Sequence, residues 1–350
     1  MRDIAFGIFD HVERSSGDPE LHRLFEERLD LIVAAEEAGF WGYHFAEHHM
    51  TQLGMTPSPG VFVAAAAART KRIRLGPLVY LLPLYHPIRL IEEICMLDHM
   101  SGGRFELGVG RGISPFELGF YRIPYYDGRE MYDEALEVLV KGLRNPRLTH
   151  HGKFYHFDDV PMEMRPMQQP NPGFWYGCNG ETNTGYAARH GMNMVMIGPT
   201  ASVTHLAQVY RDVYAKYRSG PDNLNPHLTN PKIGVQRHIF VAETDREAEA
   251  IARPAYDAFY VNLQKLWGNF GLNASVFPGT LDIAARAGVF VVGSPATVRE
   301  KLAELVDKAD FNYMMLPLSW GNLTAAQTRR SLDLFAQEIM PAYLNRADAA

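Results

Sequence analysis

Short apolar runs alternate along the chain with longer segments in which apolar side chains recur every three or four positions. A run of β-branched and aromatic residues predicts a strand, and a period near 3.6 predicts a helix. Strands are expected at 4–9, 40–45, 73–82, 104–110, 174–178, 193–198, 234–242 and 313–318. Helices are expected at 21–39, 58–69, 87–100, 130–143, from about 182, 201–218, 244–266 and 324–340. Eight strand–helix units in this order predict an α/β fold, the (β/α)₈ TIM barrel.

Two stretches depart from the repeat. Residues 145–173 hold prolines, glycines and short alternating runs, which predict a small β insertion before the fifth strand. Residues 268–295 form a long excursion within the seventh unit, and loops of this length are usually functional or mobile. We expect that excursion to be a lid over the barrel mouth, the alternative being a disordered connector. The whole chain, 1–350, is expected to be one barrel domain.

Composition narrows the classes of function. The 350 residues carry a net charge of -6 and no cluster of lysine or arginine, which argues against binding to nucleic acid or to an acidic membrane surface. No run is long enough to span a bilayer, and the first residues lack the apolar core of a signal peptide. Cys95 and Cys178 stand far apart in the sequence, which fits a reducing compartment. We therefore expect a cytoplasmic protein that acts on small molecules.

A glycine-rich loop follows the fourth predicted strand, in the stretch GRFELGVGRGISP. Its glycines, Gly108, Gly110 and Gly112, do not have the G-x-G-x-x-G spacing of a dinucleotide-binding turn. The carboxyl ends of barrel strands form the active face, so this loop is expected to lie where ligands bind. Arg111 offers a forked, permanently charged donor suited to a phosphate, although pairing with a structural carboxylate is an equal alternative at this point.

A second candidate half-site lies in CNGETNTGYAARHG, residues 178–191, where a strand leads into a helix. Asn179, Gly180 and Asn183 fall at the expected helix start. Backbone amides at such a start attract phosphate groups. Simple N-capping by Thr182 or Asn183 is the other interpretation, and the two are compatible.

The stretch YHFAEHHM contains His44, Glu47 and His48, which match the letters of the zinc motif H-x-x-E-H. That motif requires a helix, on which residues four apart share a face. The alternating aromatic residues of 40–45 predict a strand instead, so we expect no metal site. At the end of that strand His48 would face the cavity as a general base or hydrogen-bond donor, with Glu47 beside it to orient or tune a ring. A passively packed histidine is the alternative.

Three segments resemble the bacterial luciferase-like flavin monooxygenases, which include the luciferase catalytic subunit and the type II FMN-dependent monooxygenases. They are AEHHMTQLGMTPSPGVFVAAAA, IRLGPLVYLLPLYHPIRLIEEICMLDHMSGGRFELGVGRG and VVGSPATVREKL. The resemblance runs through nearly the whole chain. The order EHH, H-P-x-R and S-x-G-R-F-x-x-G-x-x-R-G is quite specific to that family.

The resemblance implies roles for individual residues. His48 falls on the catalytic histidine of the EHH motif, and Arg111 falls on the arginine that holds the 5′-phosphate of FMN. Leu78 and Val79 fall on a cis peptide bond beneath the flavin ring. The residues expected to bind FMN are Leu78, Val79, Gly110, Arg111, Gly112, Ile113, Asn179, Gly180 and Asn183.

By the same resemblance, a separate flavin reductase supplies reduced FMN. Dioxygen then forms a flavin 4a-hydroperoxide, which oxygenates a small, apolar, aldehyde- or ketone-like substrate. Gly110 replaces the reactive cysteine of the luciferase catalytic subunit, which argues against light emission and is expected to open space near the flavin. A homodimer is expected, formed by the helices at 60–70 and 87–100. Side chains expected to shape an apolar substrate site are Phe6, Phe9, Tyr80, Met196 and Trp320.

Two other functions stay open. A hydride-transferring oxidoreductase that uses a deazaflavin or FMN shares this barrel by resemblance. A flavin-binding protein without turnover is the second alternative, and the presence of both His48 and Arg111 argues against it.

Overall fold

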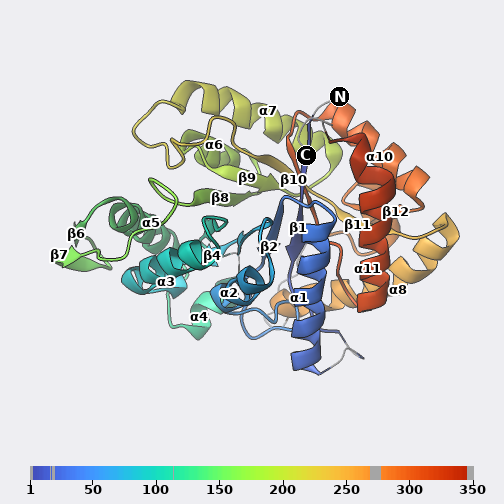
Figure 1. Ribbon diagram of the computed structural model, residues 1–350, viewed down its shortest axis with the longest axis horizontal. Coiled ribbons are helices and arrows are strands. Elements are labelled where there is room, and N and C mark those ends of the chain that lie inside the picture. Colours follow the sequence, from blue (N-terminus) through green and yellow to red (C-terminus); the bar gives the residue numbers. More distant parts are fainter. Residues whose placement is uncertain (1–2, 16, 18–19, 113, 269–276, 345–350) are drawn as a thin grey trace.

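The computed structural model describes residues 3–15, 17, 20–112, 114–268 and 277–344. Its centre is a ring of parallel strands in the order β3-β2-β1-β13-β10-β9-β8-β5 (Figure 1). A bridge between Leu75 and Phe105 brings β5 next to β3, so the parallel sheet is a nearly closed barrel. The strands are β1 (Ala5–Asp10), β2 (Gly42–Phe45), β3 (Arg74–Pro77), β5 (Glu106–Gly110), β8 (Gly173–Cys178), β9 (Asn193–Met196), β10 (Ile233–Gln236) and β13 (Tyr313–Leu316).

Helices surround this ring of strands (Figure 1), and their apolar side chains are buried on the inward face. In α5, for example, Tyr132, Ala135, Leu139 and Leu143 are buried at intervals of three or four residues, as the apolar period requires. The longer helices are α1 (Leu21–Glu37), α2 (Pro59–Arg69), α3 (Pro87–Met100), α5 (Gly128–Arg144), α6 (Glu181–Arg189), α7 (Thr200–Tyr217), α8 (Asp245–Gly268), α10 (Pro295–Lys308) and α11 (Ala325–Leu334). The shorter ones are α4 (Pro115–Phe120) and α9 (Leu281–Arg286), with single turns at Leu82–Leu84, Phe335–Ile339 and Met340–Ala342.

The predicted alternation of strands and helices is confirmed, but two predicted strands are divided. The run 73–82 ends its barrel strand at Pro77, and a short strand β4 (Tyr80–Leu81) pairs with β5 beyond a break. The run 234–242 leaves the barrel after Gln236. Its second half, β11 (His238–Val241), pairs instead with β12 (Phe290–Gly293) in a separate two-stranded sheet. Turn-forming or polar residues stand at both breaks, Gly76-Pro77 in the first run and Gln236-Arg237-His238 in the second. The apolar residues on either side nevertheless predicted one continuous strand in each run.

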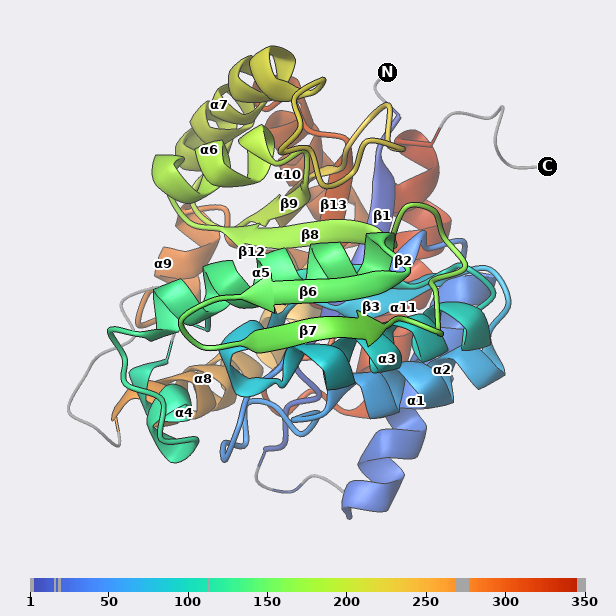
Figure 2. The ribbon, with the colours of Figure 1, turned by 90° about the vertical axis from the view of Figure 1, so that its left-hand side faces the viewer.

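The stretch 145–173 contains an antiparallel hairpin of β6 (Arg147–His151) and β7 (His156–Pro161), which lies outside the barrel strands (Figure 2). In the expected lid, residues 269–276 lie outside the described residues, while α9 and β12 occupy much of the remainder. Within the described part of the chain, no helix is both long and apolar enough to cross a membrane.

Candidate active site

A cavity of about 360 Å³ opens at the carboxyl ends of the barrel strands. Phe9, Gly110, Tyr176, Gln236 and Met315 line it from five different strands. Its volume falls within the range of roughly 300–1,000 Å³ that is typical of small-molecule sites. The cavity therefore occupies the face on which barrel enzymes carry their active sites.

His48 lies on this cavity in the loop that follows β2. Its Nδ1 is 3.2 Å from Oε1 of Glu117, and the same oxygen accepts the backbone N–H of His49 at 2.8 Å. No hydrogen bond of the His48 Nε2 is made to any described residue. One ring nitrogen is thus held by a carboxylate, and the other is available to a ligand in the cavity.

The ring of His48 also stacks on the ring of His11, with 5.7 Å between centroids and 14° between planes. Burial, and secondly the proximity of His48, lowers the pKa of His11 to about 3. His11 is therefore neutral at pH 7 and acts as a flat wall beside His48. Glu117 therefore contacts the edge of the His48 ring and His11 contacts its face, so that both residues hold the ring in its orientation.

Glu47 contacts a histidine ring, but the ring is that of His49 and not that of His48. Oε1 of Glu47 lies 2.8 Å from Nε2 of His49, while Oε2 accepts hydrogen bonds from the Leu81 amide at 3.1 Å and the Tyr85 hydroxyl at 3.0 Å. Successive side chains in an extended segment point to opposite sides, so Glu47 reaches the second histidine after it and not the first. Burial raises the pKa of Glu47. Glu47 orients His49 and the loop above β4.

Glu117 takes the role that the sequence suggested for Glu47. Its side chain is buried in the cavity wall, and its Oε2 has no hydrogen-bond partner among the described residues. Sequence reasoning missed it because it lies 69 positions from His48. The spacing Ser114-x-x-Glu117 is a capping signal that places an acid in the first turn of a helix, and the Ser114 hydroxyl does accept the Glu117 amide at 3.5 Å.

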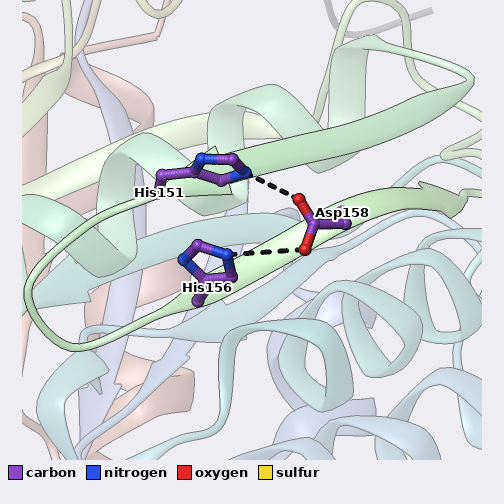
Figure 3. Close-up of side chains that lie close together, drawn as sticks. All are labelled: His151, His156 and Asp158. Atoms are coloured by element: carbon purple, nitrogen blue, oxygen red, sulfur yellow. Dashed lines mark hydrogen bonds and ion pairs between the residues drawn. The ribbon is translucent and has the colours of Figure 1, made fainter.

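The two histidines of the H-x-x-E-H sequence do not converge. Nε2 of His44 lies 3.0 Å from the Tyr313 hydroxyl inside the barrel, and burial lowers the pKa of His44 to about 3. Among the described residues, the group spaced to hold a metal is His151, His156 and Asp158 on the β6–β7 hairpin (Figure 3). All three are exposed, and their nitrogens lie 2.7 and 3.4 Å from the Asp158 oxygens.

Arg111 is half-buried on the cavity wall. Its guanidinium lies 5.6 Å from the centre of the Tyr125 ring, and its Nε donates to the Gly112 carbonyl at 3.4 Å. No carboxylate among the described residues pairs with Arg111, which argues against the alternative that Arg111 forms a structural ion pair. Gly112 has a φ of +88°, which turns the chain after Arg111. Ile113 lies outside the described residues.

The peptide bond between Leu78 and Val79 is cis, and both residues line the cavity. The glycines of β5 allow this segment to lie against the strand. A Cβ on Gly108 would be 2.9 Å from the Leu78 Cα, and one on Gly110 would be 2.4 Å from the Val79 Cγ2. The expectation that Gly110 opens space beside the flavin is therefore wrong, because Val79 fills that space.

The start of α6 forms another wall of the cavity. Asn179 and Asn183 line it, and Gly180, with a φ of +82°, is the residue before the helix. No side chain caps the first turn, and the amide of Asn183 donates to the Asn179 carbonyl at 3.4 Å. The expected N-capping by Thr182 or Asn183 is therefore absent from this described helix start. Uncapped amides at a helix start favour an anion.

Two further lining residues were not predicted as site residues. Arg129, at the start of α5, brings a second guanidinium to the wall, 5.1 Å from the centre of the Tyr186 ring. Cys178 is buried, and burial raises its pKa to about 12, so its thiol stays protonated and unreactive at neutral pH. Of the apolar side chains predicted at the site, Phe9 lines the cavity, while the others are buried in the core: Phe6, Tyr80, Met196 and Trp320.

One cavity of this parallel barrel thus carries a held histidine, an arginine without a carboxylate partner among the described residues and an uncapped helix start, an arrangement that suits an anionic ligand. Residues 4–310 match the family model described as luciferase-like monooxygenase. The chain belongs to the luciferase-like monooxygenase family.

Two relatives and two solved structures illustrate the similarity. An uncharacterized protein of Sinorhizobium fredii is 36% identical and is matched over 91% of this chain and 92% of its own length. The oxygenase component of the flavin-dependent trigonelline monooxygenase of Acinetobacter baylyi is 28% identical over 73% of this chain and 70% of its own.

The monooxygenase RslO1 of Streptomyces bottropensis superimposes with a TM-score of 0.85 at 26% identity, covering 97% of this chain and 100% of that one. The oxygenating constituent of 3,6-diketocamphane monooxygenase of Pseudomonas putida, solved in complex with FMN, has a TM-score of 0.79 at 22% identity, covering 97% and 98%. Members of this family thus include flavin-dependent monooxygenases, and one of the same fold holds FMN.

Proposed function

We propose that this protein is the oxygenase component of a two-component FMN-dependent monooxygenase. The observation that carries the proposal is one cavity bearing both the His48–Glu117 pair and an anion-binding wall made by Arg111 and the start of α6. A separate flavin reductase would supply reduced FMN. Bound reduced FMN would deliver two electrons to dioxygen, one atom of which enters the substrate while the other leaves as water.

The residues of the cavity fit FMN. Arg111 and the amides at the start of α6 would hold the phosphate, since a forked cation and uncapped N–H groups both favour a dianion. The segment Leu78–Val79 and the side chain of Met315 offer apolar surface to the flavin ring. The remaining strand ends would exclude water from the reacting atoms.

His48 is proposed as the catalytic acid–base residue. Its Nε2 would give a proton to, or take one from, the ligand in the cavity, while Nδ1 stays held at Oε1 of Glu117. Glu117 is proposed as a positioning residue, because it contacts the histidine and fixes the direction of its ring. Proton transfer depends on that direction.

Glu117→Gln is expected to lower the single-turnover rate of product formation on the order of tenfold, because the amide keeps an acceptor for the His49 N–H but loses the charge that holds His48. FMN affinity and melting temperature are expected to stay unchanged. Asp158→Asn, which removes the carboxylate of an exposed histidine pair on the hairpin, is the matched control. A loss confined to melting temperature, with a normal rate for the folded fraction, would show that Glu117 is only structural.

We propose a small, apolar, aldehyde- or ketone-like substrate, because Phe9, Val195, Ile197 and Met315 give the cavity a largely apolar wall. The test supplies the protein with FMN, a flavin reductase, NADH and ¹⁸O₂ and offers a panel of such compounds. Mass spectrometry should find one labelled oxygen atom in a product. Turnover without label, or turnover only with a deazaflavin under anaerobic conditions, would favour hydride transfer instead. The absence of any turnover across the panel would favour a flavin-binding protein.

We also propose a homodimer formed through α2 and α3, which pack against each other. Val61 on α2 and Met96 and Met100 on α3 are exposed by 74%, 50% and 55%, so this helix pair presents apolar side chains that a second chain could cover. Light scattering is expected to give the mass of two chains, and Val61→Glu is expected to give one. A native chain that is monomeric at micromolar concentration would contradict the proposal.

A further inference from the structure

A second cavity, of about 830 Å³, lies outside the barrel between α7, α9, β12 and α10. We call it the outer groove. Helices α7 and α10 contact each other beside β12 (Figure 1). The outer groove and the active-site cavity share no lining residue: Gln236, the last residue of β10, lines the cavity, and Arg237, where the chain leaves the barrel, lines the groove. The two sites are therefore distinct.

Arg237 is the unusual residue of the outer groove. It is only 1% exposed, and its Nη1 donates to the carbonyl of Gln236 at 2.8 Å. Its Nη2 has no hydrogen-bond partner, and no carboxylate among the described residues pairs with it. Burial lowers the pKa of Arg237 to about 10, so the guanidinium remains charged at neutral pH. A buried charge without a counter-ion is costly, and buried charges in proteins are normally paired.

The start of α7 faces the same groove. Pro199, Thr200 and Ala201 line it, and the residue before the helix is a proline whose side chain cannot cap. The first hydrogen bond of the helix runs from the Val203 amide to the Pro199 carbonyl at 3.1 Å, which leaves the preceding amides without helical partners. Helix α7 has 18 residues, and its first residues line the groove, so the partial positive charge at its start lies there.

Thr200 also lies close to the turn that leads into β12, since a Cβ on Gly288 would be 3.0 Å from the Thr200 hydroxyl oxygen. Arg237 is adjacent in sequence to His238, whose amide donates to the Val289 carbonyl of the same turn. The buried guanidinium and the start of α7 are thus brought together at one end of β12.

Most of the remaining charges of the outer groove are positive. Arg286 and Lys301 line it, and Lys301 donates to the Val292 carbonyl at 3.3 Å. Each lies near a carboxylate outside the groove, Asp282 for Arg286 and Asp245 for Lys301, and interacts with it electrostatically. The acidic residue on the wall, Glu304, is already paired with Lys308. The floor is apolar and consists of Phe290, Leu302 and Leu305. The groove therefore combines positive charge with an apolar surface.

We propose that the outer groove binds a small organic phosphate, with the phosphate on Arg237 and the start of α7 and the apolar part on the floor. Arginine and uncapped helix amides both match the geometry and charge of a phosphate. Lys301 and Arg286 add charge at the rim. This site is independent of the FMN proposed for the active-site cavity.

The test is isothermal titration calorimetry of the full chain with phenyl phosphate as the probe, and with inorganic phosphate for comparison. The titration is repeated in the Arg111→Ala chain, whose active-site cavity lacks its phosphate arginine. Arg237→Gln is expected to weaken phenyl phosphate binding by roughly tenfold or more, and Lys301→Gln by about threefold to tenfold, since the latter is exposed. The affinity should be unchanged in Lys216→Gln, an exposed control near the far end of α7.

Lys301→Gln and Arg286→Gln keep the test decisive if Arg237→Gln does not fold, because both residues are on the surface. Persistence of binding in the Arg111→Ala chain, together with binding weakened by about threefold to tenfold in these two variants, supports the site. The proposal is overturned if both variants bind phenyl phosphate as Lys216→Gln does, or if binding disappears in the Arg111→Ala chain. Equal affinity for inorganic phosphate would overturn the role of the apolar floor.

Discussion

His48→Ala is expected to lower the single-turnover yield of product from pre-reduced FMN by about 10²- to 10⁴-fold, the range for loss of a positioned proton-transfer group. The physical reason is that Nε2 of His48 has no partner among the described residues and faces the active-site cavity, while its other nitrogen is held by Glu117. FMN binding and the melting temperature should change little.

His151→Ala is the control for this variant, because it also breaks a histidine–carboxylate pair but lies on the exposed hairpin. A passively packed histidine would give the opposite pattern, in which His48→Ala lowers the melting temperature and activity falls only with the folded fraction. A normal product yield from a well-folded His48→Ala protein would end the catalytic assignment.

Arg111→Ala is expected to weaken FMN binding by roughly 10- to 100-fold and to leave riboflavin binding nearly unchanged. A charge-assisted contact to phosphate contributes about 1.5–3 kcal/mol, and riboflavin has no phosphate. Fluorescence titration of both flavins measures the difference directly. Arg189→Ala is the matched control, since that guanidinium also lies over a tyrosine ring, 5.1 Å from the centre of Tyr217, but outside the cavity.

Equal losses for FMN and riboflavin would contradict the role of Arg111 as the phosphate ligand. They would show instead that the contact of Arg111 with Tyr125 shapes the cavity as a whole. A loss of affinity for FMN alone would support the proposal that Arg111 of the glycine loop holds the phosphate, together with the start of α6.

The barrel could be predicted from the sequence because each of its units is local. A strand and the helix that follows it fall within a few tens of residues, and each shows its own hydrophobic period. The resemblance implied the cis bond at Leu78–Val79, which the structure contains. The division of the runs 73–82 and 234–242 into two strands each was not predicted, because it depends on which distant strand is available for pairing.

The candidate site could be predicted only where its residues belong to a recognisable sequence motif. The glycine spacing around Arg111 and the histidines after β2 identified two walls of the cavity. The partner of His48 did not follow from sequence, since the nearest acid in the chain, Glu47, turns to His49 and a more distant one, Glu117, occupies its place. Arg237 could not be identified from the sequence, because a single arginine between two strand segments is common and only the structure shows that this one is buried.

The most direct test of a monooxygenase function is a rapid-mixing experiment in which the protein loaded with reduced FMN meets oxygenated buffer. Dissolved oxygen and the absorbance of oxidised FMN are followed together, and free reduced FMN is the reference. We expect oxygen to be consumed well before the oxidised-FMN absorbance returns, because the cavity would hold the flavin away from water beside His48. Two signals that change together at the rate of free reduced FMN would contradict a monooxygenase function.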